Sequence, residues 1–264
     1  MIKVRNLWKC YGQLQVLRGL DLDVIEGETL VILGRSGVGK SVLLRQLIGI
    51  EKADRGSIYI DDTCISDINL LNRVELARTM GMLFQAGALF DSMTVGDNVA
   101  FYLNQHCPEM SRKEIQEAVS WALEMVGLQG IEQKMPSDLS GGMRKRAALA
   151  RLIVYRPRLL LYDEPTTGLD PITAMQINEL INQTKKALSD KGRKATSIVV
   201  THDIRSALEV GDRFAFHHEG KLIYIAPPQE FFAIDDPLLR RFFANATVSP
   251  ELIDQAKRGA LGTG

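Results

Sequence analysis

The chain has 264 residues, of which 45% are hydrophobic and 24% are charged, as in an ordinary globular protein with a substantial core. Lys plus Arg and Asp plus Glu both number 32, and this zero net charge argues against a large basic surface for nucleic acid. The three cysteines are scattered without metal-ligand spacing, and the sequence shows neither a signal peptide nor an apolar run of membrane-spanning length. We therefore expect a protein of the reducing cytoplasm that is not itself embedded in a membrane.

The predicted elements begin with strands near Ile2–Leu7 and Leu20–Val24, and Tyr11 lies between them. The apolar run Thr29–Leu33 predicts a buried strand, and the helical pattern Val42–Ile48 follows shortly afterwards. The segment that joins this strand to this helix is rich in glycine, and it is the first place where the sequence indicates chemistry.

This joining segment, Gly34-Arg35-Ser36-Gly37-Val38-Gly39-Lys40-Ser41, matches the phosphate-binding loop pattern in its proper strand–loop–helix setting. Glycines let backbone N–H groups approach an anion, and the helix N-terminus adds partial positive charge. We expect Lys40 to contact the β- and γ-phosphates and Ser41 to bind Mg²⁺. A Gly-rich turn before a core helix is the alternative. The candidate nucleotide-binding residues here are Gly34, Arg35, Ser36, Gly37, Val38, Gly39, Lys40, Ser41 and Val42.

The middle of the chain changes from strand to helix patterns. Met80–Phe84 predicts a buried strand that ends at Gln85, and from residue 86 to 155 one helical pattern follows another. Ser111 and Glu114 form a capping-box pattern before one helix, and Ser140 is a suitable N-cap for a later one. Residues 86–155 are therefore a candidate helical subdomain, inserted between α/β parts at residues 1–85 and 156–232.

Two acidic residues, Asp163 and Glu164, follow the four bulky apolar residues of the predicted buried strand Leu159–Asp163. Ligands of open parallel sheets bind at the carboxyl ends of strands, so a carboxylate there can hold Mg²⁺. Glu164 is placed to polarise an attacking water as general base. On their own, these residues would be interpreted as a solvated turn.

The remaining elements are a helix at Ile172–Leu188, a buried strand at Thr196–Thr201 that ends at His202, and a hairpin. The hairpin pairs Arg213–His218 with Lys221–Ala226. Residues 233–264 should form a C-terminal extension that is partly disordered near its end.

Leu139-Ser140-Gly141-Gly142-Met143, followed by Leu161-Tyr162-Asp163-Glu164-Pro165, resembles the signature of ATP-binding cassette (ABC) ATPases. The resemblance covers about residues 1–232. It implies an α/β fold with a RecA-like P-loop NTPase core, an N-terminal antiparallel β-subdomain and the inserted helical subdomain. It also implies a Mg²⁺-dependent ATPase, whose ATP hydrolysis is coupled to transport.

The same resemblance implies roles for individual residues. Tyr11 would stack on adenine, Gln85 would form the Q-loop, and Gly168-Leu169-Asp170 would form the D-loop. The implied catalytic residues are Glu164, His202, Gln85 and Lys40, and the implied Mg²⁺ ligands are Ser41, Gln85 and Asp163. Taken singly, the aromatic, the glutamine and the histidine would each have an ordinary structural explanation. A second copy of the chain would place four residues on the ATP of its partner in a head-to-tail dimer: Ser140, Gly141, Gly142 and Asp170.

One departure from the ABC pattern is Met143, where the family most often has Gln. The flanking segments Phe84–Val95 and Leu139–Arg151, and also Asp236–Phe243, are similar to the ATPase subunit of Mla-type (Mce-associated) phospholipid transporters. This similarity implies phospholipid transport between bacterial membranes, with the chain peripheral on the cytoplasmic face of the inner membrane. The implied partners are integral-membrane permease subunits, a small regulatory subunit and a substrate-binding Mce-type protein, without nucleic acid.

Alternative functions stay open at this point. An amino-acid, metal or drug ABC transporter is the main one. A soluble ABC ATPase of DNA repair or translation would normally have tandem cassettes or a coiled-coil insertion, and a P-loop kinase or GTPase would lack the LSGG segment. The basic run Arg144-Lys145-Arg146 is interpreted as a solvated helix face.

Overall fold

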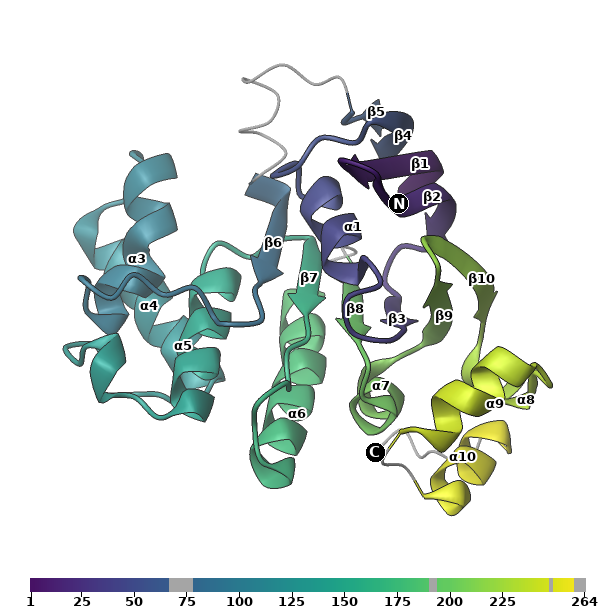
Figure 1. Ribbon diagram of the computed structural model, residues 1–264. Helices are drawn as coiled ribbons and strands as arrows, with labels where there is room; N and C mark the ends of the chain where they lie inside the picture. The colour runs from purple at the N-terminus through teal and green to yellow at the C-terminus, as the bar shows by residue number, and fades with distance from the viewer. Residues whose placement is uncertain (67–77, 190–193, 247–248, 259–264) are drawn as a thin grey trace. The chain divides into compact units, whose positions relative to one another are not determined.

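The computed structural model describes residues 1–66, 78–189, 194–246 and 249–258. The chain divides into two compact units (Figure 1). One unit combines residues 1–77 with residues 196–264, and the other is formed by residues 78–195. Both units combine strands with helices, so the chain is an α/β protein.

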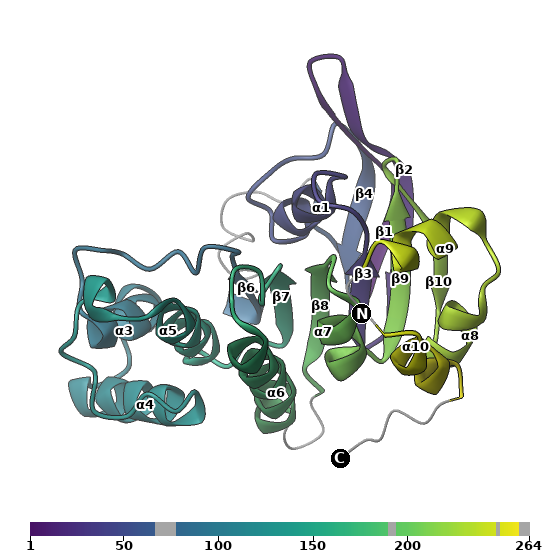
Figure 2. The ribbon, with the colours of Figure 1, turned by 60° about the horizontal axis from the view of Figure 1, so that its bottom comes forward.

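The first unit begins with an antiparallel sheet whose strand order is β2-β1-β4-β5. Its strands are β1 (Ile2–Tyr11), β2 (Leu14–Val24), β4 (Arg55–Ile60) and β5 (Thr63–Cys64). The β1–β2 hairpin continues well beyond the predicted strand Ile2–Leu7 (Figure 2). Asn6, with a φ of 48°, lies at a shift in the β1–β2 register. Because this irregularity interrupts the period-2 pattern, the sequence reveals only the first part of β1.

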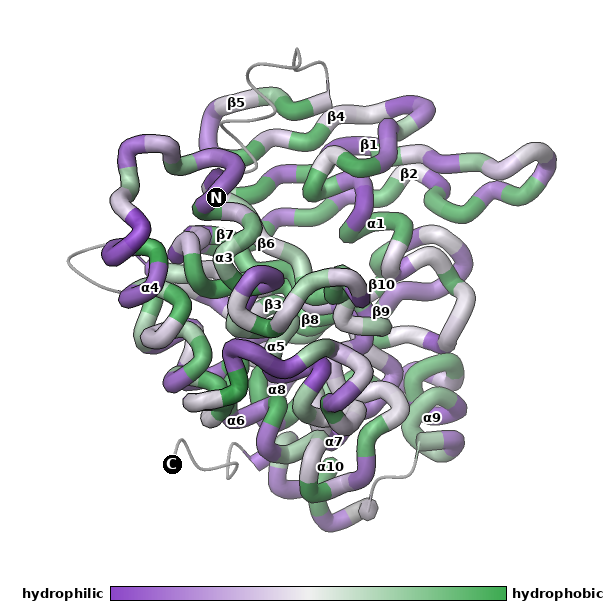
Figure 3. Tube along the Cα trace, turned by 90° about the vertical axis from the view of Figure 1, so that its left-hand side faces the viewer, coloured by the Kyte–Doolittle hydropathy of each residue, from purple (hydrophilic) through white to green (hydrophobic). Residues whose placement is uncertain are grey.

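Four further strands of the first unit pair in the order β10-β9-β3-β8. They are β3 (Thr29–Leu33), β8 (Thr196–Thr201), β9 (Arg213–His218) and β10 (Lys221–Ala226). β3 runs parallel to both β8 and β9, and β10 forms the predicted hairpin with β9. Every residue of β3 and β8 is buried, and β3 is almost wholly apolar. This is the composition expected of parallel strands with both faces covered. Figure 3 shows the hydropathy of the described residues along the chain.

The helices of the first unit are α1 (Lys40–Leu47), α7 (Ile204–Val210), α8 (Pro228–Ala233), α9 (Pro237–Ala244) and α10 (Pro250–Lys257). An aromatic cluster joins β9 to α8 and α9. Phe232 lies 5.2 Å from Phe214 and 5.3 Å from Phe243, measured between ring centroids. The C-terminal extension therefore packs through α9 on α8, which itself contacts β9, whereas its end, residues 259–264, lies outside the described residues.

The second unit holds two parallel strands, β6 (Met80–Leu83) and β7 (Leu159–Asp163). Its helices are α3 (Val95–His106), α4 (Arg112–Met125), α5 (Gly141–Ile153) and α6 (Pro171–Leu188), with a short 3-10 turn at Pro136–Asp138. Helices α3, α4 and α5 pack on one another. Both bonds of the predicted capping box between Ser111 and Glu114 are present, and Ser140 caps α5 as predicted.

Within the described ranges, none of the helices is both long enough and apolar enough to cross a lipid bilayer.

Candidate nucleotide-binding and catalytic site

The predicted phosphate-binding loop joins β3 to α1 within the first unit. Gly39 is the N-cap residue of α1 and has a φ of 107°, a conformation that residues with a side chain rarely adopt. A Cβ at Gly39 would lie 2.6 Å from Val16 Cγ1, and one at Gly34 would lie 2.7 Å from the carbonyl oxygen of His217. Close packing therefore requires glycine at both ends of the loop. Residues 35–37 between them are exposed, so an anion can reach the loop and the helix N-terminus.

Lys40 is the first residue of α1 and is almost fully buried. Its Nζ donates hydrogen bonds to the carbonyl oxygens of Gly34, at 2.8 Å, and Arg35, at 3.1 Å. The ammonium group thus lies against the loop that precedes it. Ser41 is half-buried and Val42 is buried in the same helical turn. A glycine-lined loop, a helix N-terminus, an ammonium group and a hydroxyl together fit the phosphates of a nucleotide and their Mg²⁺ ion.

His202 lies at the same sheet edge as this loop. β3 and β8 are parallel, with Leu33 opposite Thr201. Gly34 and His202 directly follow these two residues, so the loop and the exposed histidine leave the sheet side by side. Asp203 caps α7 immediately afterwards and fixes the backbone next to the histidine.

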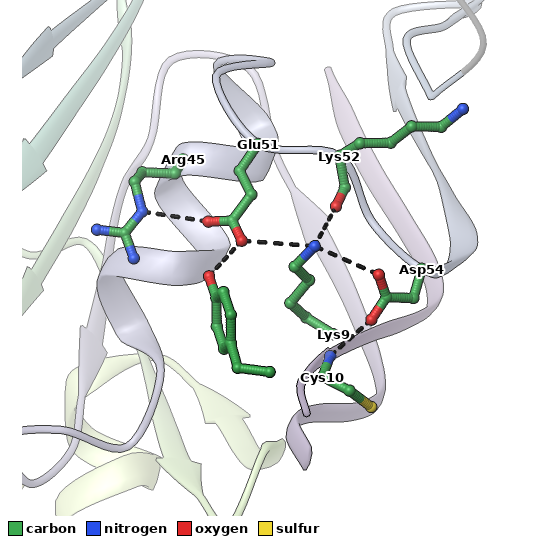
Figure 4. Close-up of polar contacts among 7 residues, drawn as sticks. Lys9, Cys10, Arg45, Glu51, Lys52 and Asp54 are labelled. Carbon is green, nitrogen blue, oxygen red and sulfur yellow. Dashed lines mark hydrogen bonds and ion pairs between the residues drawn. The ribbon is translucent and has the colours of Figure 1, made fainter. Parts of the chain in front are cut away.

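Tyr11 ends β1 at the tip of the hairpin, and 45% of its surface is exposed. Its hydroxyl donates to Glu51, which also forms ion pairs with Arg45, at 3.3 Å, and Lys9, at 3.5 Å (Figure 4). Burial, with the hydrogen bond to Glu51, raises the pKa of the Tyr11 hydroxyl. Lys9 is anchored in turn by Asp54, at 3.3 Å. The ring is thus held at its hydroxyl end while much of its surface stays open to a stacking partner.

Asp163 and Glu164 lie at the carboxyl end of β7 in the second unit, and both side chains are buried. Glu164 has a φ of 47°, which is uncommon for a residue other than glycine. Thr167 Oγ1 donates a hydrogen bond to Glu164 Oε2 at 3.1 Å. The acidic pair is therefore enclosed, unlike the solvated turn that these residues would suggest on their own, and the Glu164 carboxylate is oriented by a neighbouring hydroxyl.

Gln85 follows the neighbouring strand β6. Leu83 of β6 is opposite Tyr162 of β7 in a parallel pair. Phe84-Gln85 and Asp163-Glu164 directly follow this pair, so the structure brings the exposed Gln85 and the acidic pair to one edge.

Ser140 is the N-cap residue of α5, and its Oγ accepts a hydrogen bond from Met143 N at 3.3 Å. A hydroxyl that accepts this bond still has its proton to donate to a ligand. The cap uses the backbone N–H of Met143 and not its side chain, so methionine in place of glutamine leaves the cap intact. Gly141 is exposed beside it, and a Cβ at Gly142 would lie 2.6 Å from Thr173 Cγ2.

Asp170 has a local task within the chain, because it caps α6. Its carboxylate accepts hydrogen bonds from Ile172 N, Thr173 N and Thr173 Oγ1, at 3.1, 3.0 and 2.6 Å. The hydroxyl of Thr173, followed by its backbone N–H, lowers the pKa of Asp170. The second unit thus presents two capped helix N-termini, those of α5 and α6, in contact through Gly142 and Thr173.

The interpretation of residues 144–146 as a solvated face is wrong for Lys145. This residue is only 6% exposed, because α5 places it on the same side as the buried Leu149 and Leu152. A lysine within an apolar helical stripe is a signal that the sequence analysis passed over. His217, whose backbone touches the phosphate-binding loop, and Glu51, which holds Tyr11, were also missed, and the sequence around them shows no comparable signal.

Comparisons with known proteins agree with this geometry. The family model described as "ABC transporter" matches residues 17–167. The "Probable ribonucleotide transport ATP-binding protein mkl" of Mycobacterium leprae is 39% identical over 249 residues, which cover 94% of this chain and 70% of that protein. The "Intermembrane phospholipid transport system ATP-binding protein MlaF" of Haemophilus influenzae is 36% identical over 250 residues, which cover 95% of this chain and 92% of that protein.

A solved structure is similar as well. The dimeric post-hydrolysis state of the ATP-binding cassette MJ0796, bound to ADP and phosphate, has a TM-score of 0.77 to this chain at 29% identity. The alignment covers 86% of this chain and 98% of that one. These findings confirm the α/β cassette fold, ATP and Mg²⁺ as cofactors, and ATP hydrolysis as the activity. The chain belongs to the family of ABC transporter ATPases and is the ATP-hydrolysing subunit of such a transporter.

Proposed function

We propose that this ATPase drives phospholipid transport between the inner and outer membranes of a bacterium. The supporting observation is the match to the phospholipid-transport relative over nearly the whole length of both chains, together with the Mla-type segments Phe84–Val95 and Leu139–Arg151. In this proposal the chain is a peripheral subunit on the cytoplasmic face of the inner membrane. It works with permease subunits, a small regulatory subunit and an Mce-type substrate-binding protein.

The loop at residues 86–94 is built as a rigid surface on which a permease subunit could dock. The fully buried Asn98 side chain holds it with four hydrogen bonds: its Oδ1 accepts from Phe90 N, and its Nδ2 donates to the carbonyl oxygens of Phe90, Met93 and Thr94, all at 2.7–3.1 Å. Arg151 donates to Ala88 O at 2.7 Å, and its guanidinium lies 4.3 Å from the centroid of the Phe90 ring. Phe90 is 37% exposed on this fixed loop. An ordered loop with an exposed aromatic ring suits a protein interface, because little ordering entropy is lost on binding.

We assign the site residues as follows in this proposal. Tyr11 stacks on the adenine, Lys40 and the loop N–H groups bind the phosphates, and His202 contacts the γ-phosphate. Ser41, Gln85 and Asp163 hold Mg²⁺, which neutralises charge on the phosphates. Glu164 polarises the attacking water as general base.

A second copy of the chain completes each site in this proposal. Ser140, Gly141 and Gly142 at the N-terminus of α5 offer a hydroxyl proton and backbone N–H groups, which together bind anions. These groups would contact the γ-phosphate of the ATP held by the partner, with Asp170 nearby in the same protomer. The dimeric cassette MJ0796 is consistent with such an arrangement.

The function is tested by purifying the chain with its membrane partners from detergent extracts and identifying bound proteins and lipids by mass spectrometry. We expect a permease subunit and bound phospholipid. A periplasmic solute-binding protein without phospholipid would contradict the proposal and favour an amino-acid, metal or drug transporter. Phe90→Ala should reduce recovery of the permease, and Ile25→Ala, which alters a 58% exposed residue of the other unit, is the matched control.

A further inference from the structure

Lys145 is a buried cation at the start of the second turn of α5. Its Nζ donates hydrogen bonds to three backbone carbonyl oxygens: that of Pro165 at 2.7 Å, Thr167 at 2.9 Å and Glu164 at 3.4 Å. All three belong to the turn that follows β7. An ammonium group has three protons, so each of them has an acceptor in this turn.

Because Lys145 is charged, these hydrogen bonds hold the turn in place more strongly than bonds from a neutral donor would. Hydrogen bonds from a charged donor are shorter and stronger than those between neutral groups. If the ammonium were removed, buried carbonyl oxygens would be left without this partner, and each would favour a rearrangement that restores one. Burial lowers the pKa of Lys145, and the nearby charge of Glu164 opposes that shift.

The turn itself needs such support, because Glu164 adopts left-handed backbone angles with a φ of 47°. A residue with a Cβ is strained there by about 1–2 kcal/mol and stays there only when its surroundings hold it. Thr167 N donates to Glu164 O at 3.2 Å, and Thr167 Oγ1 donates to Glu164 Oε2 at 3.1 Å. Lys145 binds the backbone of this turn, and the same turn orients the Glu164 carboxylate through Thr167.

We propose that Lys145 is a positioning residue for Glu164: it reaches from α5 to the carbonyl oxygens of residues 164, 165 and 167 and so holds the carboxylate in its working orientation. This inference rests on the proposed role of Glu164 as general base. Lys145 does not touch the nucleotide in this scheme and acts only through the turn.

The test begins with Lys145→Met in the full-length chain, since methionine has a similar length and no proton to donate. We expect kcat to fall by about 10- to 100-fold, the range expected when a reacting group is displaced by about 1 Å. The affinity for ATP should stay within about twofold, because the phosphate-binding loop is unchanged. Hydrogen exchange of the backbone at residues 164–169 should become faster, which is a readout independent of activity.

Arg146→Met is the matched control on the same helix. Arg146 donates to the carbonyl oxygens of Val126 and Gly127, at 3.4 Å each, and not to the turn. The Arg146→Met variant should leave kcat and the hydrogen exchange of residues 164–169 unchanged. Lys145→Gln keeps a shorter donor and should retain an intermediate kcat, which provides a second reading if the methionine variant folds poorly.

A double variant separates positioning from a general loss of structure. If Lys145 acts through Glu164, Lys145→Met should slow the Glu164→Gln enzyme by much less than it slows the unmodified enzyme. Two results would overturn the positioning role of Lys145 and leave the base role of Glu164 intact. One is that Lys145→Met slows the Glu164→Gln enzyme as much as it slows the unmodified enzyme. The other is that Lys145→Met leaves kcat unchanged while Glu164→Gln lowers it. Wild-type turnover of Glu164→Gln would overturn the base assignment and the inference together.

Discussion

Replacing His217 with methionine should make the protein more resistant to acid. His217 lies on β9 with 1% of its surface exposed, and neither ring nitrogen has a hydrogen-bond partner among the described residues. Burial, followed by the charges of Lys40 and His218, lowers the pKa of His217 from 6.5 to about 4. The imidazole is therefore neutral in the folded protein under conditions in which the unfolded chain would bind a proton.

The sign of the pH dependence follows from this difference. Because the pKa is lower in the folded state, the unfolded state takes up the proton first as the pH falls below 6.5. The stability that the neutral His217 contributes is fully present above pH 6.5. It is lost progressively as the pH falls from 6.5 to about 4. With a folded pKa of about 4 and an unfolded pKa of 6.5, the loss attributable to His217 at about pH 5 is about 2 kcal/mol.

The assay is urea unfolding of both proteins at about pH 8 and about pH 5, followed by the fluorescence of the tryptophans. His217→Met should gain about 2 kcal/mol relative to the natural protein between the two conditions. His106→Met, which removes a half-buried histidine of the other unit, is the control for losing a histidine from the unfolded chain. If the difference in unfolding free energy between His217→Met and the natural protein is the same at both pH values, His217 does not bind its proton more weakly in the folded state.

Three further changes test the nucleotide site. Glu164→Gln should preserve ATP binding and slow hydrolysis by about 10²- to 10⁴-fold in a phosphate-release assay, and an unchanged rate would remove Glu164 from the role of base. Tyr11→Ala should weaken ATP binding by about 1–3 kcal/mol in calorimetry whereas Tyr11→Phe should not, and equal affinities of all three proteins would exclude base stacking. Gly39→Ala should abolish measurable ATP binding and lower the melting temperature, because the added Cβ meets Val16 at 2.6 Å. Gly130→Ala is the control for backbone strain, because Gly130 has a φ of 77° and no atom in the described part of the chain lies within 4 Å of the added Cβ. If Gly130→Ala lowers the melting temperature as much as Gly39→Ala does, the contact with Val16 is not the cause.

The elements that local sequence patterns define were predicted well. β3 and β7 are short apolar runs whose residues are all buried, and the phosphate-binding loop follows one of them as expected. The N-cap residues Ser111 and Ser140 correctly predicted the starts of α4 and α5, because an N-cap and its hydrogen-bond partners lie within a few residues of each other in the sequence. The full length of β1 was not predictable in this way, because the irregularity at Asn6 breaks the alternation on which a strand prediction depends.

The support around the site could not be predicted, because it joins residues that are distant in the sequence. Glu51 holds Tyr11 from forty residues away, and Lys145 binds the carbonyl oxygen of Pro165 from twenty residues away. A local sequence pattern cannot predict contacts between residues this far apart in the sequence. It shows at most that a charged residue lies in an apolar stripe, as Lys145 does.

Lys145 and His217 are both polar groups placed in the core, but the structure treats them differently. Lys145 has an acceptor for each of its protons, so its removal leaves backbone carbonyl oxygens of the 164–167 turn without this donor. His217 has no such partner within the described residues, so its removal leaves no hydrogen-bonding group behind and eliminates an acid-sensitive one. The same substitution, to methionine, should therefore destabilise the protein at position 145 and stabilise it in acid at position 217. Burial alone would assign both changes the same sign, and the hydrogen-bond partners are what separate them.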